Sequence, residues 1–197
     1  MLIRPVEPTD LAALYEVGLR TGHAGEDATE LFDDPRLLGE VYVGPYVMLE
    51  EGIGFTLVDE AGLPAGYVLG AVDTRRFEEA AEEKWWPPLR ERYPEPEQDP
   101  ATADEEMIAL IHHPELASDE VVAEYPAHLH IDLLPHIQGR GVGRTMMDRL
   151  FEELRSRGVP GVHLGADPQN VRAIGFYEHL GFTHLGDGDD VVMGKRL

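Results

Sequence analysis

The sequence predicts an α/β fold in which strands, some of them antiparallel, alternate with amphipathic helices that pack on the sheet. Polar and apolar side chains alternate along His128–Leu133, and a glycine-rich turn and a helical pattern follow, so a strand, a turn and a helix succeed one another. Two short apolar runs, Gly54–Val58 and Ala65–Val72, enclose the polar turn Asp59–Gly62 and predict an antiparallel hairpin. Apolar side chains recur every four residues between Val142 and Leu154, which predicts an amphipathic helix packed on the sheet.

Before the hairpin, the chain predicts two strands and one helix. Leu2–Val6 is typical of a short first strand. A helix is expected over Leu11–Gly18, capped by Asp10 or by the threonine before it. Thr21–Glu40 is rich in glycine and acidic residues and predicts an irregular connection, after which Tyr46–Leu49 is predicted to be a strand.

A long segment, residues 73–126, separates the hairpin from the strand at His128. Phe77–Tyr93 is predicted to be helical but broken at Pro87-Pro88. A second helix is expected over Thr102–Ile111, and the acidic, proline-rich stretch Pro94–Pro100 between the two predicts an irregular, mobile loop. We interpret the whole segment as an insertion between the third and fourth core strands and as a wall of an acceptor site.

The remainder of the chain completes the alternation of helices and strands. The helix that begins at Val142 should end at Gly158 and Pro160, because glycine favours the helix C-terminus and proline cannot continue it. The expected later elements are a strand at Gly161–Ala166, a helix at Val171–Leu180 capped by Asn170 and ended by Gly181, and a last hairpin of Phe182–Leu185 and Val191–Lys195 around the turn Gly186–Asp190.

Composition narrows the class of protein. A chain of 197 residues without cysteine is long enough for one domain with its own core and excludes disulfides, thiolate metal sites and cysteine nucleophiles. No run of about 18 apolar residues and no leader pattern is present, which predicts a cytoplasmic protein that does not enter a membrane. The net charge of −22 argues against nucleic acid as a partner and favours cationic ones, although a solvated acidic surface explains it equally well.

One stretch reverses the sign of the charge. Between Gln138 and Gly158, five arginines outnumber three acidic residues. Three glycines, Gly139, Gly141 and Gly143, stand between the strand and the helix, where main-chain N–H groups and the helix dipole favour an anion. The spacing is neither that of a Walker loop nor that of a dinucleotide fingerprint. It predicts a site for a polyanionic cofactor.

Two motifs make the sequence resemble the GNAT superfamily of acetyl-CoA-dependent N-acetyltransferases. The first is Gln138-x-x-Gly141-x-Gly143, which is similar to that family's pyrophosphate-binding loop. The second is the segment Asn170–Phe182, in which Asn-x-x-Ala-x-x-Phe-Tyr-x-x-x-Gly-Phe is similar to the helix and strand that flank the coenzyme A thiol. Their order and separation along the chain also match the family.

A narrower resemblance covers most of the chain more loosely. Trp85–Pro94, Tyr125-Pro126 and Asp189–Leu197 are similar to parts of the acetyltransferase-like C-terminal domain of animal protein O-GlcNAcases. This implies a bacterial-type GNAT relative of that domain and implies no glycosidase activity. The animal domain departs from the cofactor loop, whereas this sequence keeps Gln138, Gly141 and Gly143.

The GNAT resemblance implies a single domain over residues 1–197, in which a mixed, mainly antiparallel sheet is splayed at its centre and has helices on both faces, with acetyl-CoA held in the splay. The acetyl group would pass to a primary amine by direct attack, and Thr21–Glu40 would cover the acceptor. Members of the family often form homodimers, but no stretch here marks an interface. The residues implied to bind the cofactor are Ile131, Leu133, Leu134, Gln138, Gly139, Arg140, Gly141, Val142, Gly143, Arg144, Asn170, Phe176 and Tyr177.

The implied catalytic residues lie on the central strand and on the later helix. Tyr177 matches the family's usual general acid for the leaving thiolate. His128, His130 and Asp132 share the polar face of the strand and are candidates for the base or for binding the ammonium, with Glu124 as a further candidate base. A water chain in place of a single base also stays open. A His-x-His strand suits a metal, but no third ligand lies at a recognisable spacing, so no metal site is expected.

Two other functions remain open at this point. The O-GlcNAcase resemblance allows a non-catalytic module that binds coenzyme A or a protein partner. An acetyltransferase that acts on a hydroxyl group would suit a histidine base. The identity of the acceptor, whether a small amine, an amino-acid derivative or a lysine side chain, does not follow from the sequence.

Overall fold

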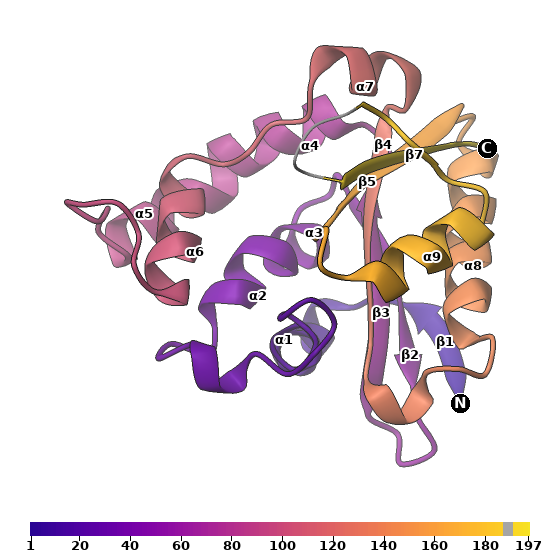
Figure 1. Ribbon diagram of the computed structural model, residues 1–197, viewed down its shortest axis with the longest axis horizontal. Coiled ribbons are helices and arrows are strands. Elements are labelled where there is room, and N and C mark those ends of the chain that lie inside the picture. The colour runs from indigo at the N-terminus through magenta and orange to yellow at the C-terminus, as the bar shows by residue number, and fades with distance from the viewer. Residues whose placement is uncertain (187–190) are drawn as a thin grey trace.

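In a computed structural model that describes residues 1–186 and 191–197, the chain folds around one sheet with the strand order β1-β2-β3-β4-β5-β7-β6 (Figure 1). The expected turn Gly186–Asp190 and the resemblance at Asp189-Asp190 fall, apart from Gly186, outside the described residues. The strands are β1 (Leu2–Pro5), β2 (Gly52–Val58), β3 (Pro64–Ala71), β4 (Ala127–Leu133), β5 (Gly161–Ala166), β6 (Thr183–His184) and β7 (Val191–Arg196).

The sheet is mixed, mainly antiparallel and splayed at its centre, which confirms the predicted fold class. All neighbouring strands are antiparallel except β4 and β5, which run parallel. These two pair only where they begin, Ala127 with Val162 and His128 with His163. Beyond His128 the two strands separate, and each keeps only its outer antiparallel neighbour.

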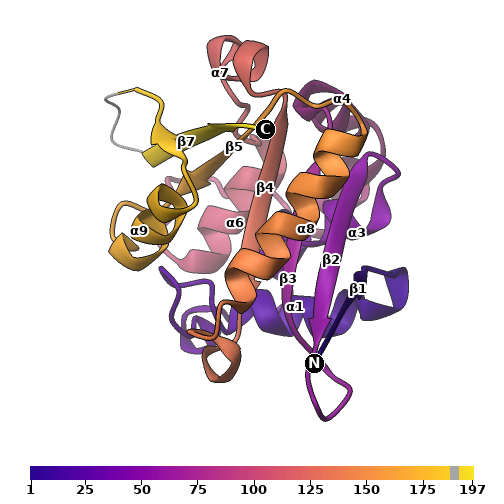
Figure 2. The same ribbon diagram turned by 90° about the vertical axis from the view of Figure 1, so that its right-hand side faces the viewer.

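Helices cover both faces of the sheet. Helix α8 (Val142–Ser156) crosses β2, β3 and β4 on one face, and α1 (Leu11–Leu19) lies on the other (Figure 2). Methionine, leucine and phenylalanine side chains of α8 are fully buried against the strands, as its four-residue apolar repeat predicts. Helix α9 (Val171–His179) follows β5 and leads into the last hairpin.

The segment 73–126 lies between β3 and β4 and is mostly helical. It contains α4 (Thr74–Ala80), a π-helical turn (Ala81–Trp85), α5 (Trp86–Arg92), α6 (Ala103–His112) and α7 (Asp119–Glu124). Its two ends meet at Thr74, whose N–H and hydroxyl both donate to the carbonyl of Pro126 at 2.8 Å. The helices α4 to α6 lie on the same side of the sheet as α2; α4 leads away from the sheet, and α6 packs on α2 (Figure 1).

The predicted strand Tyr46–Leu49 is wrong, because this stretch belongs to helix α3 (Gly44–Met48). Pro45 stands in its first turn, where no N–H is needed, and so starts a helix. The apolar run packs on β2 and β3, and the Tyr46 ring stacks on Phe77 with 4.4 Å between ring centroids. The preceding connection also holds a helix, α2 (Leu37–Tyr42), and two 3-10 turns flank α1 and α2, η1 (Pro8–Asp10) and η2 (Thr29–Leu31).

The predicted break at Pro87-Pro88 is also wrong. Both prolines stand in the first turn of α5, and the irregularity lies before them in the π-helical turn. The second expected helix is confirmed as α6, with the Thr102 hydroxyl accepting from the N–H of Glu105 at 3.2 Å. The sequence analysis did not predict α7, which Ser118 caps.

Asp10 does not cap α1 as expected. Its carboxylate accepts two hydrogen bonds of 2.7 Å from Arg4 on β1 and a third of 2.9 Å from the N–H of Glu7. The carboxylate therefore ties the first helix to the edge strand. The Arg4 bonds lower the pKa of Asp10 below its ordinary value, although burial opposes this shift.

No helix in the described ranges is both long and apolar enough to cross a membrane.

We expect Asp10→Asn to lower the free energy of unfolding at pH 7 by about 1–3 kcal/mol, the usual size for a hydrogen-bonded charged group. Because the pKa of Asp10 is lowered on folding, its stabilisation is present above the pKa of the unfolded chain and is lost as the pH falls. The difference between wild type and variant should therefore shrink below about pH 4. Urea unfolding at pH 7 and pH 3 measures it, with exposed Asp148→Asn as the control; equal differences at both pH values would contradict the assignment.

Candidate active site

The parting of β4 from β5 leaves main-chain groups of β4 without a strand partner. The N–H of Leu134 bonds to the carbonyl of Ala65 at 3.0 Å, and in an antiparallel ladder every second residue points the same way. Ile131 and Leu133 therefore direct their main-chain groups away from β3, into the gap. Leu134 has its N–H bound to Ala65 and its carbonyl to the N–H of Ile137, so neither group is free.

The glycine turn lies where β4 ends and α8 begins, after a short 3-10 helix, η4 (Pro135–Ile137). Gly139 and Gly141 have φ values of +79° and +74°, which side chains other than glycine rarely adopt, and a Cβ on either would meet nothing within 4 Å. Gly143 is different, because a Cβ there would come within 3.1 Å of Phe176. The turn is therefore open at its first two glycines and packed on α9 at the third.

The N-terminus of α8 points free donors at this open turn. Within residues 1–186 and 191–197, no acceptor is found for the N–H groups of Val142, Gly143 and Arg144, and no side chain caps the helix. The Gln138 side chain donates to the carbonyl of Leu133 at 2.6 Å and so fixes the turn against the end of β4. The geometry is that of an anion site.

Arg140 and Arg144 are the basic side chains left available at the turn. Both are exposed, and neither forms an ion pair with any residue that the structure describes, although the Arg144 guanidinium donates to the carbonyl of His179 at 3.3 Å. The arginines farther along α8 are engaged: Arg149 and Arg157 pair with carboxylates of the same helix, and Arg155 lies over the Phe151 ring. Positive charge is therefore concentrated at the N-terminus of the helix.

Tyr177 on α9 and Asp132 on β4 lie on the two sides of the gap. Tyr177 is 8% exposed, and its hydroxyl has no hydrogen-bond partner in the described part of the chain. Burial, followed by the nearby charge of Asp132, raises the pKa of Tyr177, so the phenol holds its proton at neutral pH. Burial also raises the pKa of Asp132, although the hydroxyl of Tyr67 donates to its carboxylate at 2.5 Å and opposes this shift.

His128 and His130 are joined through one tyrosine that the sequence analysis did not single out. The hydroxyl of Tyr46 lies 2.9 Å from Nε2 of His128 and 2.8 Å from Nε2 of His130. Nδ1 of His128 lies 2.8 Å from the hydroxyl of Thr74. Four residues from three separate elements, α3, β4 and α4, thus form one chain of hydrogen bonds.

The surroundings of these hydrogen-bonded residues keep both histidines neutral. Burial, together with the neighbouring histidines, lowers the pKa of His128 well below its ordinary value. Burial, and then His163, lowers the pKa of His130 to about 4. His163 on β5 lies beside His128, and its Nδ1 is 2.7 Å from the carbonyl of Tyr125. The sequence indicated the polar face of β4 but carried no signal that Tyr46 or Thr74 would lie beside it. The stretch that contains Tyr46 was predicted to be a strand.

Asn170 caps α9 as predicted. Its side chain accepts from the N–H of Ala173 at 3.0 Å. A Cβ on Gly25 would come within 3.2 Å of the Asn170 amide, so the loop after α1 reaches across to the start of α9. The predicted irregular connection therefore approaches the N-terminus of α9.

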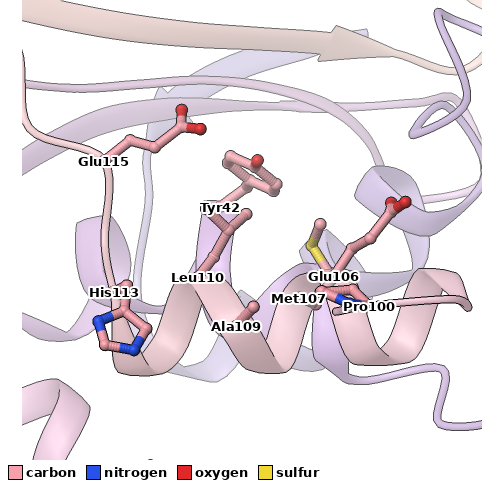
Figure 3. Close-up of a pocket in the computed structure, with 8 residues that line it drawn as sticks. All are labelled: Tyr42, Pro100, Glu106, Met107, Ala109, Leu110, His113 and Glu115. Atoms are coloured by element: carbon pink, nitrogen blue, oxygen red, sulfur yellow. The ribbon is translucent and has the colours of Figure 1, made fainter. Parts of the chain in front are cut away.

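A pocket of about 420 Å³ lies between α2 and the insertion (Figure 3). Tyr42 forms one wall and has its ring edge-on to His130, with 5.9 Å between centroids. In the view of Figure 3, the carboxylates of Glu106 and Glu115 stand on either side of this ring. Burial and then these two carboxylates raise the pKa of Tyr42 to about 12.

Other predicted candidates lie apart from the gap. Glu124 ends α7 and forms an ion pair of 2.7 Å with Arg196, where both side chains are exposed. Among the residues with described positions, no group of three or more His, Cys, Asp or Glu side chains could hold a metal ion.

Both motifs, Gln138–Gly143 and Asn170–Phe182, lie in a part of the chain that matches a known protein family. The model of the acetyltransferase (GNAT) family matches residues 49–182. The protein O-GlcNAcases of Rattus norvegicus and Mus musculus are each 28% identical over 211 residues, covering 99% of this chain and 22% of the relative. The chain therefore spans about a fifth of the length of these curated relatives.

Solved structures agree with this similarity. The crystal structure of SsHAT is 43% identical, with a TM-score of 0.91 over 99% of this chain and 97% of that one. Arabidopsis thaliana NAA60, whose structure is a complex with acetyl-CoA, has the same fold at 12% identity, with a TM-score of 0.56 over 100% of this chain and 98% of that one.

The cap at Asn170 can be tested apart from any role in binding. We expect Asn170→Ala to lower the free energy of unfolding by about 1 kcal/mol, because the N–H of Ala173 loses its acceptor. Asn170→Asp should keep the cap and leave stability within about 0.5 kcal/mol. Thermal melts of both variants measure this; an alanine variant as stable as wild type would show that the cap contributes nothing.

Proposed function

The chain belongs to the acetyltransferase (GNAT) family, and from this premise we propose that it transfers an acetyl group from acetyl-CoA to a primary amine. The observation that carries the proposal is the gap between β4 and β5, which has an anion site at one end and an unpaired phenol on its side. Acetyl-CoA carries its thioester at one end of a flexible arm and its pyrophosphate at the other, and a molecule of this shape fits such a gap. The free N–H groups of α8 would hold the pyrophosphate, and the main chain of Ile131 and the N–H of Leu133, whose carbonyl accepts from Gln138, would pair with the arm.

The chemistry follows from where the side chains stand. The amine nitrogen attacks the thioester carbonyl carbon, a carbon–nitrogen bond forms, and the carbon–sulfur bond breaks. The departing sulfur takes its proton from the Tyr177 hydroxyl, and the nitrogen loses one proton to a base or to water. A phenol whose pKa is raised by burial keeps the proton until the sulfur needs it.

The charge of the chain supports an amine as the acceptor. The net charge of −22 favours the approach of a cationic molecule, and the cavity beside His130 is flanked by Glu106 and Glu115. We propose this cavity, between α2 and the insertion 73–126, as the route by which the acceptor reaches the gap. In this proposal the chain acts as one domain with the insertion as its acceptor wall, and acetyl-CoA is the cosubstrate.

Two rival functions are kept because specific features allow them. A histidine near the gap would serve an O-acetyltransferase, and the O-GlcNAcase similarity is compatible with a module that binds coenzyme A without catalysis. Release of free coenzyme A from acetyl-CoA in the presence of n-butylamine, lysine methyl ester or n-butanol separates the three. Turnover with the amines alone supports the proposal, turnover with the alcohol supports the first rival, and binding without turnover supports the second.

We expect Gly141→Asp to abolish acetyl-CoA binding. The new carboxylate would occupy the open turn and repel the pyrophosphate, while no atom lies within 4 Å of its Cβ. Gly158→Asp is a matched control, because Gly158 has a φ of +75° and the same open surroundings at the other end of α8. Calorimetry should give wild-type affinity for the control and none for Gly141→Asp; native protein that binds no acetyl-CoA would remove the enzyme proposal.

Tyr177→Phe should leave acetyl-CoA affinity unchanged and lower kcat by about 10²–10⁴-fold, the usual range for a lost general acid. The ring keeps its packing on Phe176 and Phe182, so the fold is expected to hold. Single-turnover rates with a saturating amine measure the effect. An unchanged kcat would mean that the thiolate leaves without this proton.

A further inference from the structure

We propose that Nδ1 of His130 is the atom that accepts the proton of the acceptor amine, and that Thr74, His128 and Tyr46 are positioning residues that keep this atom unprotonated. The inference rests on the proposed acetyl transfer and names the base of that same site. It rests on the directions of four hydrogen bonds, which link the carbonyl of Pro126 through Thr74, His128 and Tyr46 to His130.

The direction is set at Thr74. Its hydroxyl lies 2.8 Å from the carbonyl of Pro126, and a carbonyl can only accept. The single hydroxyl proton of Thr74 therefore points at Pro126. Because that proton is used, the contact of 2.8 Å between this hydroxyl and Nδ1 of His128 requires a proton on Nδ1.

The remaining directions follow from His128. Neutral imidazole carries one proton, so a proton on Nδ1 leaves Nε2 of His128 as an acceptor for the Tyr46 hydroxyl. The hydroxyl then has no proton left for His130, and the contact of 2.8 Å requires a proton on Nε2 of His130. His130 is thereby held in the form whose Nδ1 has a free lone pair. An opposite assignment would need a doubly protonated, charged His128 in a buried group of rings.

Only Nδ1 of His130 is free to act. Both ring nitrogens of His128 are bonded, whereas Nδ1 of His130 has no partner in the part of the chain that the structure describes. His130 stands on the same strand face as Asp132, about 7 Å away by strand geometry, and Asp132 lies beside Tyr177. On its other side the ring meets Tyr42, the wall of the acidic cavity.

The protons balance over one turnover. The acceptor ammonium first releases one proton to solvent; the neutral amine then attacks, the Tyr177 proton goes to sulfur, and the remaining proton released from nitrogen goes to Nδ1 of His130. The imidazolium then gives its proton to solvent, and the phenolate regains one from solvent. The groups that face His130 are Tyr42, Tyr46, His128 and His163, all neutral in this arrangement, so nothing holds the charge on the ring.

The first test reads the tautomers without any substrate. Long-range proton–nitrogen NMR of the histidine side chains, assigned with single variants, should show the proton of His128 on Nδ1 and that of His130 on Nε2. Thr74→Val removes the hydroxyl that sets the direction of these hydrogen bonds. The bonds can then take the opposite direction, which puts the proton of His130 on Nδ1. Thr74→Ser should restore the native tautomers. A native proton on Nδ1 of His130, or a Thr74→Val spectrum identical to wild type, overturns the proposal.

The second test measures transfer to the amine that turns over fastest in the comparison of butylamine with lysine methyl ester. His130→Gln keeps a donor to Tyr46 but has no basic atom, and should lower kcat at least about 100-fold with acetyl-CoA affinity unchanged. Thr74→Val should lower kcat about 10-fold or more, with rescue by Thr74→Ser; exposed His184→Gln is the control. A wild-type rate in His130→Gln removes this inference alone, whereas wild-type protein that acetylates no amine removes the proposed function.

Discussion

The brief contact between β4 and β5 is the constraint on which the rest of the molecule depends. Two residue pairs hold the strands together, and the gap beyond them exposes main-chain groups that a sheet would otherwise satisfy. Such groups must find partners in water or in a ligand. The glycine turn, the uncapped N-terminus of α8 and Tyr177 all border this one gap, so a single local departure from regular pairing assembles the whole site.

The polar face of β4 shows how a buried group of titratable side chains can be made specific. His128, His130 and Asp132 differ in what they contact, although they share a strand face and a sequence pattern. Hydroxyl groups from Tyr46, Thr74 and Tyr67 decide the difference. Because burial disfavours charge on both histidines, their hydrogen bonds set which ring nitrogen carries a proton, whereas the Tyr67 hydrogen bond favours the ionised form of Asp132 against its burial.

Much of the fold and part of the site follow from sequence, for identifiable reasons. Periodicity predicted α8, because this helix buries one face along its length, whereas two continuous apolar runs around a turn predicted the hairpin of β2 and β3, whose strands are buried on both faces. It failed at Tyr46–Leu49, where four apolar residues fit a strand or a helix equally and Pro45 decided the matter. The glycines and Tyr177 were found because they belong to local motifs. Tyr46 and Thr74 were not found, because 82 and 54 residues separate them from His128 in sequence.

The closure of the insertion at Thr74 and Pro126 has a consequence for how proteins of this kind diverge. The two hydrogen bonds between Thr74 and Pro126 join the end of β3 to the start of β4, as a tight turn would. The residues between them are therefore not needed to hold the two strands together. Helices within the excursion can lengthen, shorten or change sequence without moving either strand. Selection could therefore reshape the acidic cavity in small steps while the gap and its histidines stay fixed, so that new acceptors are tried on an unaltered catalytic frame.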